Sequence, residues 1–232
     1  SQDIILGLYY LSMENKDDKS KAFLIGDRFE LEHALFSKAV SLHSKIKYRY
    51  ALKDKDGERV YKIVETTPGR VIVYNILPEC IKGDFELVNK AMTKKAVTNL
   101  IDSVYRSSGQ KETVMFCDRI MALGFKYACK AGISIGKDDM VIPESKAKHI
   151  GESLDKVKRF EQQYRDGLIT TGERYNKIID EWTHCTDKIS KEMMKAISSH
   201  KQAKDANSIY MMADSGARGS ENQIKQVAGM RG

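Results

Sequence analysis

The strongest constraint on the fold is a pair of narrow apolar stripes between residues 144 and 200. Apolar residues recur every three or four positions while the other faces carry charges of both signs, which is typical of two helices packed along a seam. Asp166-Gly167 separates the stripes, and Thr170 with Glu173 has capping-box spacing, so a helix is predicted to restart there. The stripes are formed by Ile150, Leu154, Val157, Tyr164 and Leu168, and by Tyr175, Ile178, Trp182, Cys185, Ile189, Met193 and Ala196.

This pattern predicts an antiparallel helical hairpin with arms of about 20–25 residues, which are about 30–37 Å long. A two-helix arm has little core of its own, so we expect it to project from a larger body as a docking post with an accessible tip. Tyr175 and Trp182 lie on the seam and are interpreted as packing residues.

The opening of the chain is apolar on every side. Residues 1–12 predict a short helix that needs partners on all of its faces. Residues 13–26 predict a polar loop, and the spacing from Phe29 to Val40 predicts another helix. Because the sequence starts at Ser1 without a Met and stops at Gly-Met-Arg-Gly, we expect both ends to continue in a larger protein.

A β-hairpin is predicted next. Ile46, Tyr48 and Tyr50 alternate with polar residues, Val60 and Ile63 mark a second run, and Asp56-Gly57 between the two runs is a hairpin signal. Thr66-Thr67-Pro68-Gly69 breaks the pattern. The apolar run at 71–77 fits a strand or a helix, because periodicity does not separate the two in so short a run.

From residue 90 onward the pattern is helical. One apolar face ends at Ser107-Ser108-Gly109, a second follows, and Gly132 stands where a C-terminal cap glycine belongs. Asp138-Asp139 is interpreted as a solvated turn. The two faces consist of Val97, Leu100, Ile101 and Val104, and of Ile120, Leu123, Tyr127 and Ala131.

Charge and cysteine usage suggest the chain's surroundings. The net charge of +7 and a pI near 9.0 favour polyanionic partners such as nucleic acid or nucleoside triphosphates. No run approaches the ~20 apolar residues of a membrane span and no signal peptide is visible, so a cytoplasmic protein is expected. Cysteine spacing fits no zinc motif, so buried free thiols are predicted at Cys80, Cys117, Cys129 and Cys185.

The segment at 207–220 combines small residues with one arginine. Its glycines allow close approach of a ligand to the backbone, and the Arg218 guanidinium has a fork of donors suited to phosphate. A structural arginine in a glycine-rich turn is the alternative interpretation. Ser220 is positioned to cap a short helix that follows.

Four segments, in order, resemble the largest catalytic subunit (β′) of bacterial DNA-directed RNA polymerase. The resemblance spans the whole chain and implies the region between the catalytic aspartate motif and the bridge helix. Together these segments resemble the stretch after the aspartate motif, the approach to the rim helices, the rim tip and the approach to the bridge helix. The segments are 2–10; 132–135 with 138–143; 167–170 with 172–177 and 179–180; and 207–220 with 223–224 and 228–232.

The resemblance implies a function: template-directed RNA synthesis by a nucleotidyltransferase. The family's three magnesium-binding aspartates lie in an Asn-Ala-Asp-Phe-Asp-Gly-Asp motif that is absent here, so the chain is expected to hold no catalytic residue and to be inactive alone. By the same resemblance, Mg²⁺ and the structural Zn²⁺ belong to other parts of the parent enzyme. The expected partners are two alpha subunits, beta, omega and sigma, DNA template, RNA, and nucleoside triphosphates, with no membrane.

The resemblance also assigns individual residues. Arg218 matches the arginine that contacts the triphosphate of the incoming nucleotide, where it would orient the triphosphate and neutralise charge. Gln2 and Met212 match positions near the RNA 3′ end in the secondary channel. Asp118 matches a residue of the guanosine tetraphosphate (alarmone) site, and Ala122 stands where a stacking Tyr can occur.

The rim hairpin matches the site where transcript-cleavage factors and stringent-response coiled-coil factors dock. The residues at its tip that match are Glu173, Asn176, Lys177 and Asp180. For Glu173 the alternative is a purely local capping role, and for Lys177 and Asp180 it is that of ordinary solvated charges.

We therefore expect a mostly α, α+β protein: a mixed body with a small β-hairpin, plus a projecting, coiled-coil-like antiparallel helical hairpin. The predicted domains are 1–143, the pore or funnel region of the secondary channel; 144–200, the rim hairpin; and 201–232, a linker and the segment leading to the bridge helix. The alternative function is a free-standing helical-hairpin binding module, which would have to bury the apolar opening helix by itself.

Overall fold

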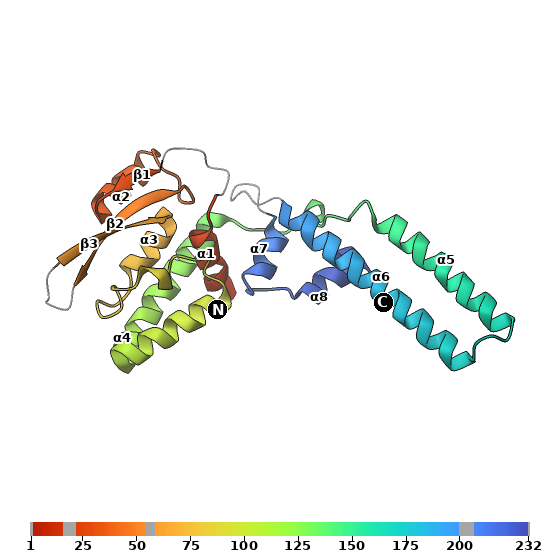
Figure 1. Cartoon of the computed structure of the whole chain (residues 1–232). Coiled ribbons are helices and arrows are strands. Elements are labelled where there is room, and N and C mark those ends of the chain that lie inside the picture. The colour runs from red at the N-terminus through yellow and green to blue at the C-terminus, as the bar shows by residue number, and fades with distance from the viewer. Residues whose placement is uncertain (1, 16–21, 54–58, 200–206, 232) are drawn as a thin grey trace. The chain divides into compact units, whose positions relative to one another are not determined.

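The computed structural model describes residues 2–15, 22–53, 59–199 and 207–231 (Figure 1). The chain is mostly helical with one small mixed sheet, so the predicted fold class is confirmed. It divides into two compact units. The first contains residues 1–134 and 201–218, and the second contains residues 135–200 and 219–232.

Helix α1 (Gln2–Ser12) lies against α4 (Lys94–Ala131) in the first unit. Leu8 and Leu11 are fully buried, as the apolar opening predicts. The two helices meet through glycines: a Cβ added to Gly7 would lie 2.0 Å from the carbonyl oxygen of Gly124. Because only a residue without a side chain permits that approach, the α1–α4 packing depends on Gly7.

The sheet has the order β1 (Phe23–Ile25), β2 (Ile46–Lys53), β3 (Arg59–Thr66). Strands β2 and β3 form the predicted antiparallel hairpin, with Ile46 opposite Thr66; the Asp56-Gly57 turn lies outside the described residues. The prediction of an unbroken loop over 13–26 is wrong at its end, because Phe23–Ile25 pairs in parallel with Ile46–Tyr48. Three residues carry too little local signal to reveal a strand whose partner lies more than 20 positions away.

Two short helices follow the ends of the sheet strands. Helix α2 (Arg28–Phe36) is shorter than the predicted 29–40, since Lys38 adopts a left-handed φ of 58°. Helix α3 (Pro68–Asn75) settles the ambiguous run at 71–77: Thr67 caps it and Pro68 occupies its first turn. These signals are the N-terminal signals of a helix rather than of a strand.

Helix α4 bends into two arms at Gly109, whose φ of 77° and ψ of −177° interrupt the helical backbone (Figure 1). The predicted break after Ser107-Ser108 is thus confirmed. Gly132 ends the second arm in the left-handed conformation, also as predicted. A 3₁₀ turn, η1 (Phe85–Leu87), precedes α4, and another, η2 (Lys137–Asp139), contains the predicted turn at Asp138-Asp139.

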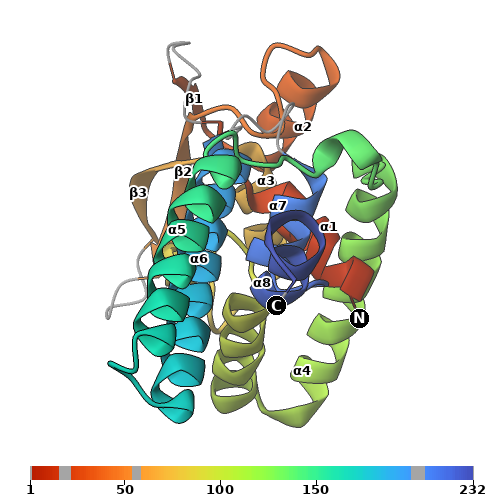
Figure 2. The same cartoon turned by 90° about the vertical axis from the view of Figure 1, so that its right-hand side faces the viewer.

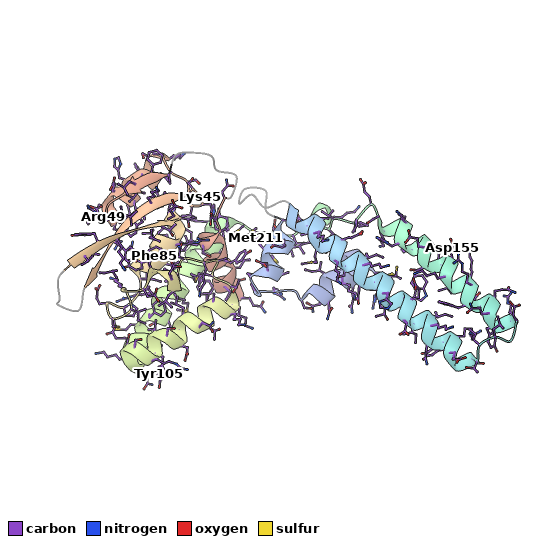
Figure 3. All side chains as sticks on the ribbon, viewed as in Figure 1. Lys45, Arg49, Phe85, Tyr105, Asp155 and Met211 are labelled. Carbon is purple, nitrogen blue, oxygen red and sulfur yellow. The ribbon has the colours of Figure 1, made fainter. Side chains whose placement is uncertain are left out.

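The core of the first unit lies between these elements. Phe85 and Phe116 are its largest fully buried side chains, and Figure 3 labels Phe85 beneath the sheet. Tyr74 packs on Phe85 with ring centroids 4.8 Å apart. Burial raises the pKa of the Tyr74 hydroxyl to about 12, and this hydroxyl donates a hydrogen bond to the carbonyl oxygen of Lys82.

The second unit contains the predicted antiparallel hairpin, α5 (Lys146–Arg165) and α6 (Thr171–Ser199), which lie side by side in Figures 1 and 2. Its base is packed, since Ile189 and Met193 are fully buried. Farther out the packing loosens. Tyr175 is 64% exposed and Leu168 73%, so the interpretation of Tyr175 as a packing residue is wrong. Two helices packed only on each other leave the side chains at the outer end of their seam exposed, which accounts for the exposure of Tyr175 and Leu168.

Three short elements complete the described chain. Helix α7 (Ser208–Asp214) belongs to the first unit, while α8 (Glu221–Ile224) and the π-helical turn η3 (Lys225–Gly229) belong to the second. Ser220 caps α8 as predicted, accepting from the Gln223 N–H at 3.3 Å. None of the helices described is both long and apolar enough to cross a bilayer.

The cysteines are free thiols but are not all buried, which corrects the prediction. Cys185 is buried in the hairpin and Cys117 is half-buried, whereas Cys80 and Cys129 are exposed. Cysteine is usually buried, and residue type alone does not reveal these two exposed positions.

Candidate functional site

A tight turn presents Arg218 at the surface of the first unit. Asn207 caps α7 through its side-chain oxygen, and the helix ends at Asp214. The buried Ser215 hydroxyl donates to the carbonyl of Met212 and accepts from the Ala217 N–H at 3.2 Å. The Arg218 N–H also donates to the Met212 carbonyl, at 3.3 Å. This local network holds the turn while the Arg218 side chain remains exposed.

Glycines on either side make this turn possible. Gly216 has a φ of 69° and Gly219 a φ of 82°, both in the left-handed region that favours glycine. In the part of the chain that the structure describes, no carboxylate forms an ion pair with the Arg218 guanidinium. Its donors are therefore free to bind an anion.

Helix α7 is tied to two distant elements. The Tyr9 hydroxyl of α1 donates to Asp214 Oδ2 at 2.5 Å, and the Lys94 N–H of α4 donates to the Ser215 carbonyl at 2.8 Å. Burial, reinforced by the bond to Asp214, raises the pKa of Tyr9 above its ordinary value. The tyrosine thus stays a neutral donor at physiological pH, and the arginine turn is anchored to the packed body.

The other two residues predicted with Arg218 lie on these same elements. Met212 is half-buried on α7, whereas its neighbour Met211, labelled in Figure 3, is buried. Gln2 is exposed at the start of α1, seven residues from Tyr9 and so about 10 Å farther along the helix axis. The three residues share one compact unit, and only Met212 is in hydrogen-bonded contact with Arg218, through its carbonyl.

The hairpin tip gives each rim residue a different environment. Glu173 forms the predicted capping box: its carboxylate accepts from the Thr170 N–H at 2.9 Å, and the Thr170 hydroxyl oxygen accepts from the Glu173 N–H at 3.3 Å. Hydrogen bonds from Thr170 lower the pKa of Glu173. The carboxylate is therefore engaged in starting α6, and the predicted capping box is confirmed.

The remaining tip residues are more accessible. Lys177 places its ammonium 5.6 Å from the centroid of the Phe160 ring on α5, which is a cation–π contact between the two helices. Asn176 and Asp180 are exposed one turn apart on α6, and no described residue forms a hydrogen bond or ion pair with either side chain. This spacing puts the two polar groups on one face of the helix.

Asp118 and Ala122 are exposed one turn apart on the second arm of α4. Their surroundings are apolar, since Val114, Met121 and Phe125 on the same arm are 56%, 44% and 48% exposed. The Asp118 charge and, more strongly, burial raise the pKa of the adjacent Cys117 thiol. Within the described residues, no cluster of three or more His, Cys, Asp or Glu side chains is arranged to hold a metal ion.

Sequence reasoning missed the residues that anchor the site. The Ser12 hydroxyl accepts from the Met92 N–H at 2.7 Å, which joins the end of α1 to the approach to α4. Tyr9 and Asp214 are 205 positions apart. No periodicity or motif signals bonds between such distant positions, and a buried tyrosine in an apolar run gives only a hint that its hydroxyl needs a partner.

Comparison with known families covers most of the chain. Residues 1–140 match the family model of RNA polymerase Rpb1, domain 3, and residues 169–232 match that of RNA polymerase Rpb1, domain 4. The chain belongs to the family of the largest subunit of RNA polymerase. Its partners therefore include other polymerase subunits and nucleic acid, and the activity to which it contributes is that of a nucleotidyltransferase complex.

Family membership also decides between the two predicted functions. The apolar helix α1 is covered within the chain by α4 and α3, so it does not by itself require outside partners. The match to two domains of one polymerase subunit, rather than the apolar opening, therefore decides against a free-standing hairpin module.

Proposed function

We propose that this chain forms the wall of the secondary channel of a bacterial-type RNA polymerase, with residues 144–200 as the rim hairpin. In this proposal transcript-cleavage and stringent-response factors dock on the hairpin tip. The observation that carries the docking proposal is the exposure of Asn176 and Asp180 on one face of α6 beside the supported Lys177. Exposed polar groups with no packing or capping role are available to a partner.

Arg218 is proposed to bind the triphosphate of the incoming nucleotide. Support comes from its exposed guanidinium, its glycine-flanked turn and the anchoring of α7 through Tyr9. A pre-positioned guanidinium stabilises charge on phosphate oxygens without reorganising. Gln2 and Met212 are proposed to face the RNA 3′ end. The magnesium ions and structural zinc of the parent enzyme are assigned to residues outside this chain.

We propose that Asp118 belongs to an alarmone site of low affinity. A guanine base binds best where a ring can stack on it, and Ala122 offers only a methyl group one turn away. Asp118 can still accept hydrogen bonds from the guanine edge. The physical expectation is a low-affinity site at this position.

The docking proposal is tested by titrating a labelled transcript-cleavage factor against the purified chain and a Lys177→Glu, Asp180→Lys double variant. The charge reversals cancel, so net charge is unchanged. The matched control is Asp155→Lys, Lys158→Glu, an exposed pair with the same spacing on α5 (Figure 3). We expect the tip variant to bind at least about 10-fold more weakly and the control to bind as the parent does. Equal loss in both variants, or no saturable binding by a chain that circular dichroism shows to be folded, would contradict the docking proposal.

A further inference from the structure

Strand β2 has an edge that the sheet leaves partly uncovered. Strand β3 pairs with β2 over its whole length, Ile46–Lys53. On the other side, β1 pairs only with Ile46–Tyr48, and at Gly26 the chain leaves the sheet to enter α2. Among the described residues no strand continues this pairing, so β2 beyond Tyr48 presents backbone N–H and C=O groups along a free edge.

A pocket of about 600 Å³ lies along this edge. Five consecutive β2 residues, Tyr48–Leu52, line it. Because successive side chains of a strand point to opposite faces, a pocket that touches all five reaches the strand's edge. With Tyr61 of β3 in its lining, it also extends over the face that carries Arg49. Its outer walls come from the turn at 26–28 and from the segment at 79–83.

The two sides of this edge differ in chemistry. On the side of the core, Tyr50 packs edge-to-face against Tyr74 with ring centroids 5.9 Å apart. On the opposite side, the Arg49 guanidinium lies 5.0 Å from the centroid of the Tyr61 ring. Among the described cations that line the pocket, Arg28 pairs with Glu32 and Lys82 with Glu79, whereas no described carboxylate lies within ion-pair distance of Arg49.

We propose that this edge binds an extended peptide segment of another polypeptide, which adds as a strand to β2 next to the end of β1. The free edge from Arg49 to Leu52 matches about four residues, or about 13 Å of strand. Main-chain hydrogen bonds supply the affinity in this mode of recognition, and alternate side chains supply the specificity. Acidic residues of the peptide face Arg49, and apolar residues between them cover Tyr50 and Tyr74.

The pocket favours a strand over a small ligand because its longest continuous lining is the run Tyr48–Leu52 along the uncovered side of β2. A small aromatic anion would use Arg49 and a tyrosine ring but would leave the row of edge N–H and C=O groups unpaired. A strand of alternating acidic and apolar residues makes three kinds of contact at once. Its backbone pairs with the edge N–H and C=O groups of β2, its acidic side chains pair with Arg49, and its apolar side chains cover the tyrosines. The proposal concerns the sheet and does not depend on the proposed roles of Arg218 or the rim hairpin.

The test is fluorescence anisotropy with a dye-labelled Glu-Val-Glu-Val-Glu-Val peptide and the 232-residue chain. Two control peptides have the same charge: a block peptide, Glu-Glu-Glu-Val-Val-Val, and an alternating peptide with N-methylated backbone on every second residue. We expect the alternating peptide to bind at least about 10-fold more tightly than either control. If the block peptide or the N-methylated peptide binds as tightly as the alternating peptide, strand addition is wrong and the binding is explained by charge attraction alone.

Variants of the chain locate the binding. Arg49→Glu is expected to weaken binding at least about 10-fold, and Arg49→Gln, which removes the charge alone, several-fold. Lys111→Glu makes the same charge change at an exposed position on α4 outside the pocket and is expected to bind as the parent does. Equal effects of Arg49→Glu and Lys111→Glu in folded chains would overturn the location. A second copy of the chain could also occupy this edge. If sedimentation shows that the chain self-associates and that self-association displaces the peptide, the edge binds a second copy and the proposed partner is wrong.

Discussion

At the residue scale, Arg218 is the side chain whose proposed role has the sharpest consequence. In a polymerase assembled with this chain as part of its largest subunit, Arg218→Ala is expected to lower kcat/KM for nucleoside triphosphates by roughly 10- to 100-fold. That range follows from losing hydrogen bonds to a charged group, about 1.5–3 kcal/mol. The kcat/KM of Arg218→Lys should fall between those of the parent enzyme and Arg218→Ala, since lysine keeps the positive charge but lacks the forked donors of the guanidinium.

The matched control for this kinetic test is Arg106→Ala. Arg106 is an exposed arginine of the same unit that pairs with Asp102 one turn away on α4. Steady-state kinetics should show no change in kcat/KM for this control. An Arg218→Ala enzyme with parental kinetics would show that the turn is structural, which is the alternative interpretation of a glycine-flanked arginine.

At the element scale, the capping box of α6 predicts a pH dependence of the hairpin tip. The pKa of Glu173 is lowered in the folded state from its ordinary value of 4.5. Its contribution to stability is therefore fully present above the unfolded pKa, and it is lost as pH falls through the lower folded pKa. The helical content of the chain, measured by circular dichroism, should decline in that acidic window as the start of α6 loosens, and Glu173→Gln should remove this part of the decline. A decline of the same size in Glu173→Gln would assign it to other carboxylates.

The break in α4 makes a second prediction at this scale. Gly109 combines a φ of 77° with an extended ψ, a region that residues with a side chain rarely occupy. Gly109→Ala is expected to lower the free energy of unfolding by about 1–3 kcal/mol, although open space surrounds the position. Urea unfolding followed by circular dichroism measures this loss.

The control for the Gly109 prediction is Gly151→Ala in the interior of α5. This glycine is exposed, helical and free of close neighbours, so alanine is expected to stabilise the hairpin by about 0.5–1 kcal/mol. If both substitutions stabilise the chain, the backbone at Gly109 carries no strain and the bend has another cause.

At the scale of the whole molecule, the two compact units have separate buried clusters. The large core lies entirely in the first unit, and the buried base of the hairpin lies in the second. The single tryptophan, Trp182, belongs to the second unit, so its fluorescence reports on that unit alone. Two unfolding transitions are therefore expected.

Core truncations distinguish the units. Leu8→Ala is expected to destabilise the first unit by about 2–5 kcal/mol without moving the Trp182 midpoint in urea. Ile189→Ala should lower the Trp182 midpoint by a comparable free energy, because Ile189 is fully buried at the hairpin base. Shifts of the Trp182 midpoint in both variants would show that the units unfold as one cooperative body.

Sequence alone determined the features that depend on neighbours within about four residues. The seam residues recur every three or four positions within each of α5 and α6, so their spacing can be read from each helix separately. The Thr170–Glu173 box and the Gly132 cap are stabilised by contacts inside one turn, so the residues that make them stand close together in the sequence. The match of ordered motifs likewise predicted the polymerase family, and the candidate residues Arg218, Asn176 and Asp180 came from it.

Only the tertiary structure decided what depends on distant partners. The strand at 23–25 exists because β2 pairs with it, α1 is covered because α4 presents a glycine to it, and the Arg218 turn is anchored because Tyr9 reaches Asp214. Exposure of Tyr175 and of Cys80 was likewise set by which elements pack on them. The free energy of such contacts depends on chain segments brought together by folding, and no local pattern in the sequence encodes that juxtaposition.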